Sequence, residues 1–287
     1  MLDRYGRNID YLRISLTDRC NLRCIYCMPE EGIRQIPRTE LLDTDEIVRI
    51  CKAASELGIS RIKLTGGEPL VRKADLVKLC EKHNDCAFLA FTNGTLVDEA
   101  FCADLKRIGN LYLAISLEGF SEVNDLRRGT GVFAKVMHAM DLLKENGLVF
   151  GTSICYTSKN YETVTSDEFI DMIVEKGCRY ALYFHYMPVG NDASLELLPN
   201  PKQRLYIKDR VREIRNMTSG KGIFTMDFQN DGEFVGGCIA GGRNYCHINP
   251  NGDVEPCVFI HYSGANIKEV GTFNGIISDI NGRFALS

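Results

Sequence analysis

The sequence lacks any apolar run near the length of a membrane span, and it lacks an excess of positive charge. A helix that crosses a bilayer needs about 20 consecutive apolar residues, and no segment of the 287-residue chain approaches that length. The formal net charge is −4, which is unlike the cationic excess of proteins that bind nucleic acid nonspecifically. We therefore expect neither a membrane nor a nucleic acid among the partners of this chain.

A secretory signal, long repeats and low-complexity tracts are also missing. The opening residues MLDRYGRNID carry basic side chains, but no apolar stretch follows them before a strand-like segment. This pattern predicts a cytoplasmic protein, in which the twelve cysteines are more often thiols or metal ligands than disulfides. The chain is long enough to bury one large core, with room for a small appendage.

Short β-branched and aromatic runs alternate with longer helical patterns along the first 200 residues. This alternation predicts an α/β fold with βα units around a parallel sheet. Six such units suit a partial (β/α)6 barrel better than a closed eight-fold barrel. The predicted strands are Tyr11–Leu16, Arg61–Leu64, Ala87–Thr92, Leu111–Leu117, Phe150–Tyr156 and Tyr180–Tyr186. The predicted helices are Asp45–Leu57, Lys73–Lys82, Asp98–Ile108, Val132–Asn146 and Ser166–Lys176, the first capped by Asp43 or Thr44.

The pattern changes near residue 200. The segment PNPKQRLYIKDRVREIRN predicts a basic helix that begins at a proline, and glycine-rich turns with short strands follow Gly220. We therefore predict a barrel domain over residues 1–200 and a small cysteine-containing extension over residues 201–287.

Three cysteines near the N-terminus have the spacing C-x3-C-x2-C. Cys20, Cys24 and Cys27 lie in the segment CNLRCIYC. Iron–sulfur cubes are normally held by four cysteine thiolates, so a loop that offers three leaves one iron open to a small chelating molecule. The alternative interpretations are a zinc site or thiols without a metal.

The stretch DYLRISLTDRCNLRCIYCMP resembles the cluster loop of the radical S-adenosylmethionine (SAM) superfamily. In that family the open iron of a [4Fe-4S] cluster binds SAM, and reductive cleavage of SAM yields a 5′-deoxyadenosyl radical. The resemblance implies both cofactors, the partial barrel, and a one-electron donor such as flavodoxin or ferredoxin. It also implies that Tyr26 contacts adenine, although a tyrosine that only packs the loop explains the residue equally well.

Further residues of the SAM site are implied by motifs at the ends of predicted strands, where parallel α/β folds gather their chemistry. The motif GGEP follows the second strand and resembles the family motif whose backbone holds the SAM ammonium group. The resemblance implies a SAM site built from Gly66, Gly67, Glu68, Pro69, Thr92, Asn93, Ser116, Glu118 and Arg128. Strand-end turns, a structural serine and a solvated arginine are the alternatives for the last five residues.

The first seventy residues also resemble the GTP 3′,8-cyclase family of molybdenum-cofactor biosynthesis, through RYGRNIDYLRISLTDRCNLRCIYCMPEEG and LGISRIKLTGGEPLVR. In that family basic residues grip the substrate triphosphate. Arg13, Arg61 and Lys63 occupy matching places, and such a group suits phosphate. The second half departs from the family, because Tyr245 and His247 stand where it has arginines.

The segment GGCIAGGRNYCHINPNGDVEPCVF contains three more cysteines around a predicted hairpin whose turn is Asn251-Gly252. It resembles the start of the auxiliary-cluster domains called SPASM and Twitch. The resemblance implies a second iron–sulfur cluster held by Cys238, Cys246 and Cys257. A zinc site or free thiols on a hairpin remain alternatives.

These features predict a radical SAM enzyme and leave its substrate open. One hypothesis is a radical cyclisation of GTP, as in molybdenum-cofactor biosynthesis. The other is radical modification of a peptide or another small substrate, with an auxiliary cluster taking part. A third hypothesis, from another class, is a non-catalytic iron–sulfur or zinc protein that senses redox state. The GGEP motif and the polar strand ends argue against this third hypothesis.

Overall fold

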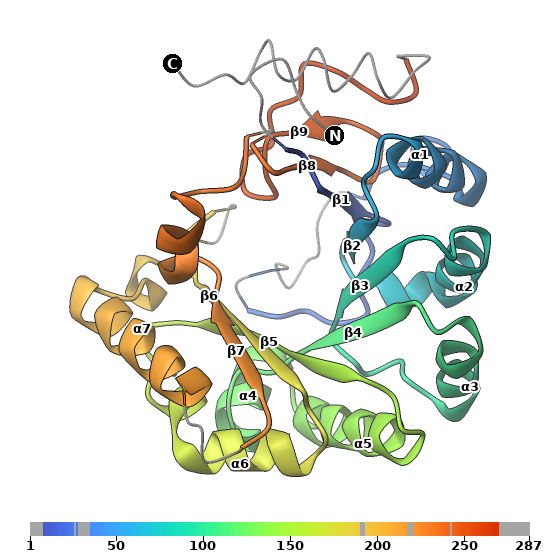
Figure 1. Ribbon diagram of the computed structural model, residues 1–287. Helices are drawn as coiled ribbons and strands as arrows, with labels where there is room; N and C mark the ends of the chain where they lie inside the picture. Colours follow the sequence, from blue (N-terminus) through green and yellow to red (C-terminus); the bar gives the residue numbers. More distant parts are fainter. Residues whose placement is uncertain are drawn as a thin grey trace.

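The computed structural model describes residues 8–25, 27, 35–189, 193–216, 221–241 and 243–269. Within these ranges one nine-stranded sheet runs in the order β7-β6-β5-β4-β3-β2-β1-β8-β9 and curves into an open barrel (Figure 1). All neighbouring strands are parallel except β8 and β9, which form an antiparallel hairpin. The strands are β1 (Tyr11–Ser15), β2 (Arg61–Thr65), β3 (Ala87–Thr92), β4 (Leu111–Ser116), β5 (Phe150–Tyr156), β6 (Tyr180–His185), β7 (Phe224–Asp227), β8 (Tyr245–Ile248) and β9 (Val254–Glu255).

The helices lie on the outside of the curved sheet, where they cover its convex face (Figure 1). None of the helices in the described ranges is both long and apolar enough to cross a membrane. The α-helices are α1 (Thr44–Glu56), α2 (Lys73–Lys82), α3 (Glu99–Ile108), α4 (Ser121–Arg128), α5 (Val132–Glu145), α6 (Asp167–Glu175) and α7 (Pro201–Asn216). Short 3-10 turns are η1 (Pro69–Arg72), η2 (Thr163–Thr165), η3 (Leu195–Leu197) and η4 (Asn230–Val235).

Local sequence explains where the first helix begins. The Asp43 side chain accepts a hydrogen bond from the Glu46 amide at 2.7 Å, and the Glu46 carboxylate accepts one from the Asp43 amide at 2.8 Å. This reciprocal pair is a capping box, which satisfies two amides that the helix itself leaves unpaired. Asp43, rather than Thr44, is therefore the N-cap of α1.

Side-chain alternation along the strands separates a core outside the barrel from a second set of side chains inside it. On β1, Leu12 and Ile14 are fully buried in the main apolar cluster under the helices. The intervening Tyr11 faces the other way and stacks on Tyr245 of β8, with ring centroids 4.7 Å apart. Residues 13 and 15 share this inward face with Tyr11, so β1 and β8 supply polar groups to the barrel interior.

The predicted α/β partial barrel with a small extension is confirmed, and all six predicted strands are present within about two residues at each end. The predicted proline-started helix is α7, and the predicted hairpin is β8–β9. The prediction missed β7, which pairs with β6 and extends the same sheet, and it missed the short helix α4. The proposed boundary near residue 200 stays a prediction.

Candidate active site

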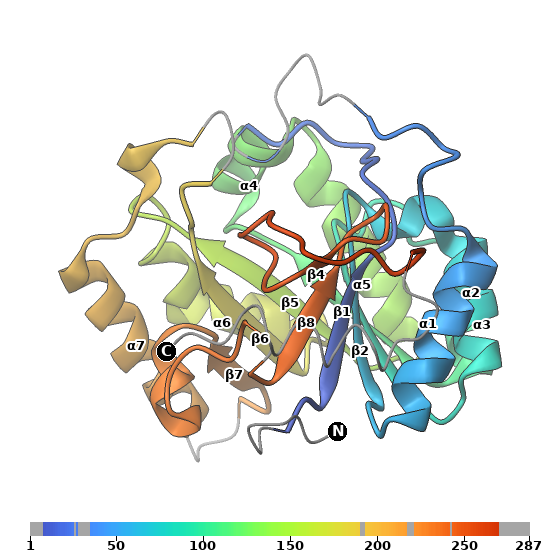
Figure 2. The ribbon, with the colours of Figure 1, turned by 90° about the horizontal axis from the view of Figure 1, so that it is seen from above.

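Most of the predicted SAM and cluster residues lie at the carboxyl ends of β1 to β4. The cysteine loop leaves β1, the GGEP motif leaves β2, Thr92 ends β3 and Ser116 ends β4. Figure 2 shows that the loop that follows β1 passes across one end of the barrel, next to α4. Four segments far apart in the sequence therefore meet at one barrel mouth.

Tyr26, which the resemblance places against adenine, lies outside the described residues.

Two of the three loop cysteines lie beside groups that donate to sulfur. The Leu22 amide lies 3.4 Å from the Cys20 sulfur, and the Asn93 side-chain nitrogen lies 4.0 Å from the same atom. An Arg128 guanidinium nitrogen lies 3.9 Å from the Cys24 sulfur. Such donors favour thiolates, which are the form that binds iron. The loop chemistry therefore fits a [4Fe-4S] cluster.

The same loop fits a single metal ion less well. Among the residues that the structure describes, no three His, Cys, Asp or Glu side chains stand close enough together to hold one ion. Burial raises the pKa of the Cys20 thiol. This thiol holds its proton until iron binds, so binding releases a proton.

Glu68 of the GGEP motif ties two strand ends together. Its carboxylate, only 1% exposed, accepts hydrogen bonds from the Leu70 amide at 2.8 Å, the Thr92 hydroxyl at 2.6 Å and the Asn93 amide at 2.7 Å. Burial raises the pKa of Glu68, and these three donors oppose that rise. Glu68 and Thr92 are therefore engaged with each other, and the Asn93 side chain extends beyond them to Asn21 at 2.8 Å.

The two glycines of the motif are required because backbone approaches them closely. Gly66 has φ +138°, and a methyl group on it would lie 2.4 Å from the Thr17 carbonyl oxygen. A methyl group on Gly67 would lie 2.3 Å from the Arg19 carbonyl oxygen. The motif thus packs directly under the start of the cysteine loop, where the Gly67 amide donates to the Thr17 carbonyl at 2.7 Å and the Glu68 amide donates to the Arg19 carbonyl at 2.8 Å.

We expect Gly67→Ala to destabilise the fold by about 3 kcal/mol, the upper end of the usual cost of overpacking. The clash is with backbone, which cannot rotate away as a side chain can. Urea denaturation followed by circular dichroism measures the change. Gly232→Ala is the matched control, since its added methyl group meets its nearest atom at an ordinary 3.5 Å. Equal unfolding midpoints for the two variants would contradict the close approach.

A buried carboxylate holds two adjacent arginines beside the cysteine loop. Glu118 is 1% exposed and pairs with Arg127 through one oxygen and with Arg128 through the other. Burial disfavours the charge of Arg128, but the Glu118 carboxylate raises the Arg128 pKa above its ordinary value. Arg128 thus stays charged between Glu118 and Cys24. The sequence prediction that Glu118 contacts SAM did not foresee that this carboxylate is taken up by arginines.

Arg127 is the functional residue that sequence reasoning missed. Its Nη1 also donates to the Cys155 carbonyl at 3.1 Å, which joins the end of β5 to α4. The signal was present as two consecutive arginines in RRGTG, but only a structure shows that both turn toward one carboxylate.

Ser116, another residue predicted to contact SAM, lies two residues before Glu118. It is half-buried at the end of β4.

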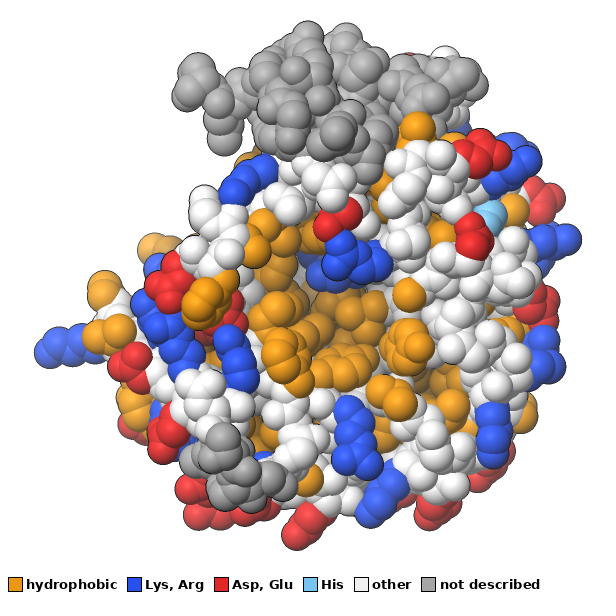
Figure 3. Space-filling view, viewed as in Figure 1, with side chains coloured by type: hydrophobic (Ala, Val, Ile, Leu, Met, Phe, Trp, Pro, Cys, Tyr) orange, Lys and Arg blue, Asp and Glu red, His pale blue; other side chains and the backbone are white. Residues whose placement is uncertain are grey.

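Two of the three basic residues predicted to hold substrate, Arg13 and Lys63, lie beside aromatic rings in the barrel interior. The Lys63 ammonium lies 4.5 Å from the centre of the Tyr11 ring, and the Arg13 guanidinium lies 5.2 Å from that of Phe91. Arg61 lies at the edge of the barrel and pairs with Asp10. The hollow in Figure 3 has mainly apolar walls with basic side chains gathered on one side. This combination suits a planar anionic molecule.

Burial is the main reason that the pKa of Lys63 falls to about 7, and the charges of Arg13 and Arg61 add to the effect. Lys63 is therefore charged in only part of the molecules at neutral pH. An anion bound beside it would favour the charged form.

The three C-terminal cysteines do not come together. Cys246 pairs with Leu12 across β8 and β1 and is buried in the main core, on the outer face of the sheet. Cys257 lies on the inner face, in a small apolar cluster with Tyr11 and Tyr245. Cys238 is exposed. The structure therefore separates Cys246 from the other two thiols.

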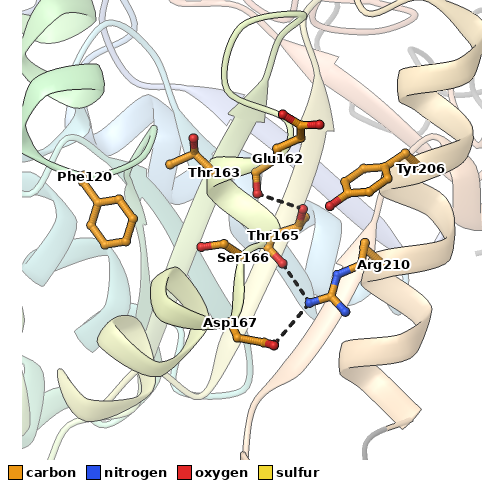
Figure 4. Close-up of a pocket in the computed structure, with 8 residues that line it drawn as sticks. All are labelled: Phe120, Glu162, Thr163, Thr165, Ser166, Asp167, Tyr206 and Arg210. Carbon is orange, nitrogen blue, oxygen red and sulfur yellow. Dashed lines mark hydrogen bonds and ion pairs between the residues drawn. The ribbon is translucent and has the colours of Figure 1, made fainter.

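A shallow pocket of about 650 Å³ lies away from these residues, between the start of α6 and α7 (Figure 4). Arg210 crosses it to bond the Thr165 carbonyl at 3.0 Å and the Asp167 carboxylate at 3.2 Å. The lining residues are Phe120, Glu162, Thr163, Thr165, Ser166, Asp167, Tyr206 and Arg210. None of the residues that the sequence motifs single out lines this pocket, and its arginine is already paired.

The fold and the three-cysteine mouth define the class of this protein. The family model of the radical SAM superfamily matches residues 14–175, more than half of the chain, and the chain belongs to that superfamily. It is a radical SAM protein whose family implies a [4Fe-4S] cluster and SAM as cofactors.

The named relatives of this chain share about 31% of its sequence. The chain is 31% identical to the GTP 3′,8-cyclase of Desulforamulus reducens, over 90% of this chain and 84% of the relative. It is also 31% identical to the GTP 3′,8-cyclase of Thermodesulfovibrio yellowstonii, over 94% of this chain and 91% of the relative.

Solved structures share the fold at lower identity. Streptococcus suis SuiB bound to the precursor peptide SuiA superposes with a TM-score of 0.78 at 18% identity, over 98% of this chain and 68% of SuiB. The structure of anSMEcpe with bound AdoMet gives 0.76 at 19% identity, over 96% of this chain and 79% of that one. At these identities the likeness concerns the fold.

Proposed function

We propose that this radical SAM enzyme holds its cluster on Cys20, Cys24 and Cys27, binds SAM across the ends of β2 to β4, and acts on an anionic substrate inside the barrel. The observation that carries the proposal is the three-thiol loop placed over the barrel mouth, with Asn93 and Arg128 within 4.0 Å of its sulfurs. When bound, the cluster supplies the electron that cleaves SAM and yields a 5′-deoxyadenosyl radical.

The chain's own residues orient SAM. The backbone carbonyls of the glycine motif are suited to the SAM ammonium group, and Ser116, at the end of β4, is suited to a hydroxyl or carboxylate. Asn93 spans from the cysteine loop to the end of β3 and aligns these two segments. Arg128, held by Glu118, offsets the negative charge of the thiolates.

For the substrate we propose a purine nucleotide, with a reaction of the GTP 3′,8-cyclase type that serves molybdenum-cofactor biosynthesis. Arg13, Lys63 and Arg61 support it as cations for a triphosphate, and the named relatives at about 31% identity support it as well. Tyr245 and His247 stand where that family has two arginines, so this interior offers a bound anion fewer positive charges. One-electron reduction would come from a flavodoxin- or ferredoxin-type donor.

A peptide substrate is the second candidate. The observation in its favour is the mainly apolar and aromatic wall of the interior, in a fold shared with a structure that binds a precursor peptide. A SPASM-type auxiliary cluster on the C-terminal thiols finds no support, because Cys246 points into the core on the far side of the sheet. We therefore propose one cluster per chain.

Product analysis separates the two candidates. Anaerobically reconstituted protein is incubated with SAM, dithionite and GTP, and the products are identified by mass spectrometry. A GTP-dependent product supports the cyclase-type reaction. Formation of 5′-deoxyadenosine without such a product removes GTP as the substrate and leaves the radical SAM activity standing.

We expect the affinity for GTP to fall about tenfold as the pH rises from 6 to 8, because a charged hydrogen bond to an anion is worth roughly 1.5 kcal/mol or more. Lys63, with a pKa of about 7, loses its charge over this interval. Equilibrium binding measured at several pH values tests this.

Lys63→Arg is the matched control, because an arginine stays charged throughout the interval. Its affinity is expected to change little with pH. If wild type and Lys63→Arg showed the same pH dependence, Lys63 would not be a ligand of the triphosphate.

A further inference from the structure

Four side chains form a continuous line of hydrogen bonds from the barrel interior to the surface. The Ser15 hydroxyl lies 2.8 Å from His247 Nε2, and His247 Nδ1 lies 2.8 Å from a Glu255 carboxylate oxygen. The other oxygen of Glu255 lies 3.3 Å from His261 Nδ1. The proposed SAM contacts do not use this line.

Its inner end is buried and its outer end is in solvent. Ser15 is 8% exposed, and both His247 and Glu255 are 3% exposed, whereas the His261 side chain is 71% exposed. Three strands supply the buried members, with Ser15 at the end of β1, His247 on β8 and Glu255 on β9. The line therefore crosses the open edge of the barrel, where the hairpin closes against β1.

The inner end lies just beneath the SAM-binding turn. Ser15 also contacts the Thr65 hydroxyl at 3.1 Å, and Thr65 is the residue that precedes Gly66 and Gly67. Ser15 itself begins the segment that leads into the cysteine loop. Ser15 lies on the inward face of β1 at this level, on the same side of the sheet as the proposed substrate.

The surroundings fix the charge of each member. Glu255 keeps its pKa below the ordinary value, because bonds and charges from His247, His261 and Asn249 outweigh its burial. Burial lowers the pKa of His247, and the charges of Arg13 on β1 and of His261 act the same way, while Glu255 opposes them. The imidazole is therefore neutral at pH 7 and the carboxylate ionised, as a proton acceptor requires.

We propose that Ser15, His247 and Glu255 form a general base of the substrate site, with His261 as a second partner of the Glu255 carboxylate at the surface; this rests on the radical SAM function proposed above. A substrate O–H or N–H gives its proton to the Ser15 oxygen as the Ser15 proton passes to His247 Nε2. Glu255 stays ionised and stabilises the imidazolium through its Nδ1–H. When the product leaves, the Nε2 proton passes to water that enters the interior, which restores the neutral imidazole. One proton leaves the substrate, one reaches solvent, and no electron moves.

Each bond of the line has a defined task in this scheme. The Asn249 amide donates to Glu255 at 3.1 Å and fixes the carboxylate plane. Glu255 selects the His247 tautomer that carries hydrogen on Nδ1, which leaves Nε2 free to accept from Ser15. Cys246, the neighbour of His247, faces the opposite side of the sheet and takes no part.

The first test needs no substrate. Exchange of the histidine C2 hydrogen for deuterium, followed by mass spectrometry across a pH series, reports the pKa of each histidine in the reconstituted enzyme. We expect Glu255→Gln to lower the His247 pKa by about one unit or more, because burial then acts without the carboxylate. An unchanged His247 pKa in this variant would overturn the proposal, whatever the substrate is.

The second test uses GTP as the probe. Because general base catalysis contributes about 10²–10⁴-fold, His247→Gln is expected to reduce product formation at least tenfold while 5′-deoxyadenosine is still released. Wild-type product formation should fall as the pH drops through the His247 pKa. His138→Gln, on the exposed face of α5, is the control and should match wild type.

Equal product yields from His247→Gln and wild type would overturn the proposal, and so would a covalent substrate adduct on Ser15, which would make the serine a nucleophile. If wild type forms no GTP product, the cyclase-type function fails, and the exchange experiment alone decides on the base.

Discussion

Replacement of Cys24 by alanine is expected to abolish SAM cleavage and to remove the iron–sulfur absorbance of the reconstituted protein. A loop with three thiolates already leaves one iron without a protein ligand, so the loss of a second ligand leaves the cube on two corners. Arg128, which lies 3.9 Å from the Cys24 sulfur, would lose that partner. Formation of 5′-deoxyadenosine from SAM and dithionite, together with iron content, measures the effect.

Cys102→Ala is the matched control, because Cys102 is also a buried thiol but lies in the helical core. This variant should keep its cluster and its SAM cleavage, with only the modest loss of stability that a small cavity causes. If Cys24→Ala still produced 5′-deoxyadenosine at a wild-type rate, the ligand assignment would be wrong.

Replacement of Glu118 by alanine is expected to destabilise the fold by about 3–5 kcal/mol, which is the cost of leaving a buried charge without its partner. Glu118 is 1% exposed, and its loss leaves the guanidinium groups of Arg127 and Arg128 in a buried site without this carboxylate. Because Arg128 also approaches Cys24, we expect poorer cluster retention in the same variant. Chemical denaturation gives the free energy of unfolding, and iron assay gives the retention.

Glu122→Ala provides the comparison, since Glu122 is exposed on α4 a few residues away. Its free energy of unfolding should stay within about 0.5 kcal/mol of wild type. A Glu118→Ala protein as stable as the Glu122→Ala protein would show that the two arginines do not depend on this carboxylate.

The first six strands and the class of the protein were accessible from sequence because they rest on local signals. Alternation of strand-like and helix-like runs predicted the βα units, and each such run carries its own pattern. Cys20, Cys24 and Cys27 lie within eight residues of one another, so their shared loop needed no tertiary information. The glycine motif was found for the same reason.

Contacts between segments far apart in the chain could not be predicted from the sequence. Ser15 and His247 are 232 residues apart and meet only because β8 pairs with β1. The strand β7, of four residues, is too short for its alternation to be distinctive. Cys238, Cys246 and Cys257 resembled the ligands of an auxiliary cluster, yet Cys246 lies in the core on the outer face of the sheet and Cys257 lies on the inner face. Spacing along a chain does not report which face a side chain occupies.

The central claim is that a [4Fe-4S] cluster on the N-terminal loop cleaves SAM, and one measurement tests it most directly. Protein purified and reconstituted without oxygen is assayed for iron and sulfide, then mixed with SAM and dithionite. We expect about four irons per chain and the release of 5′-deoxyadenosine. Protein that carries zinc, or that takes up no iron and leaves SAM intact, would contradict this account.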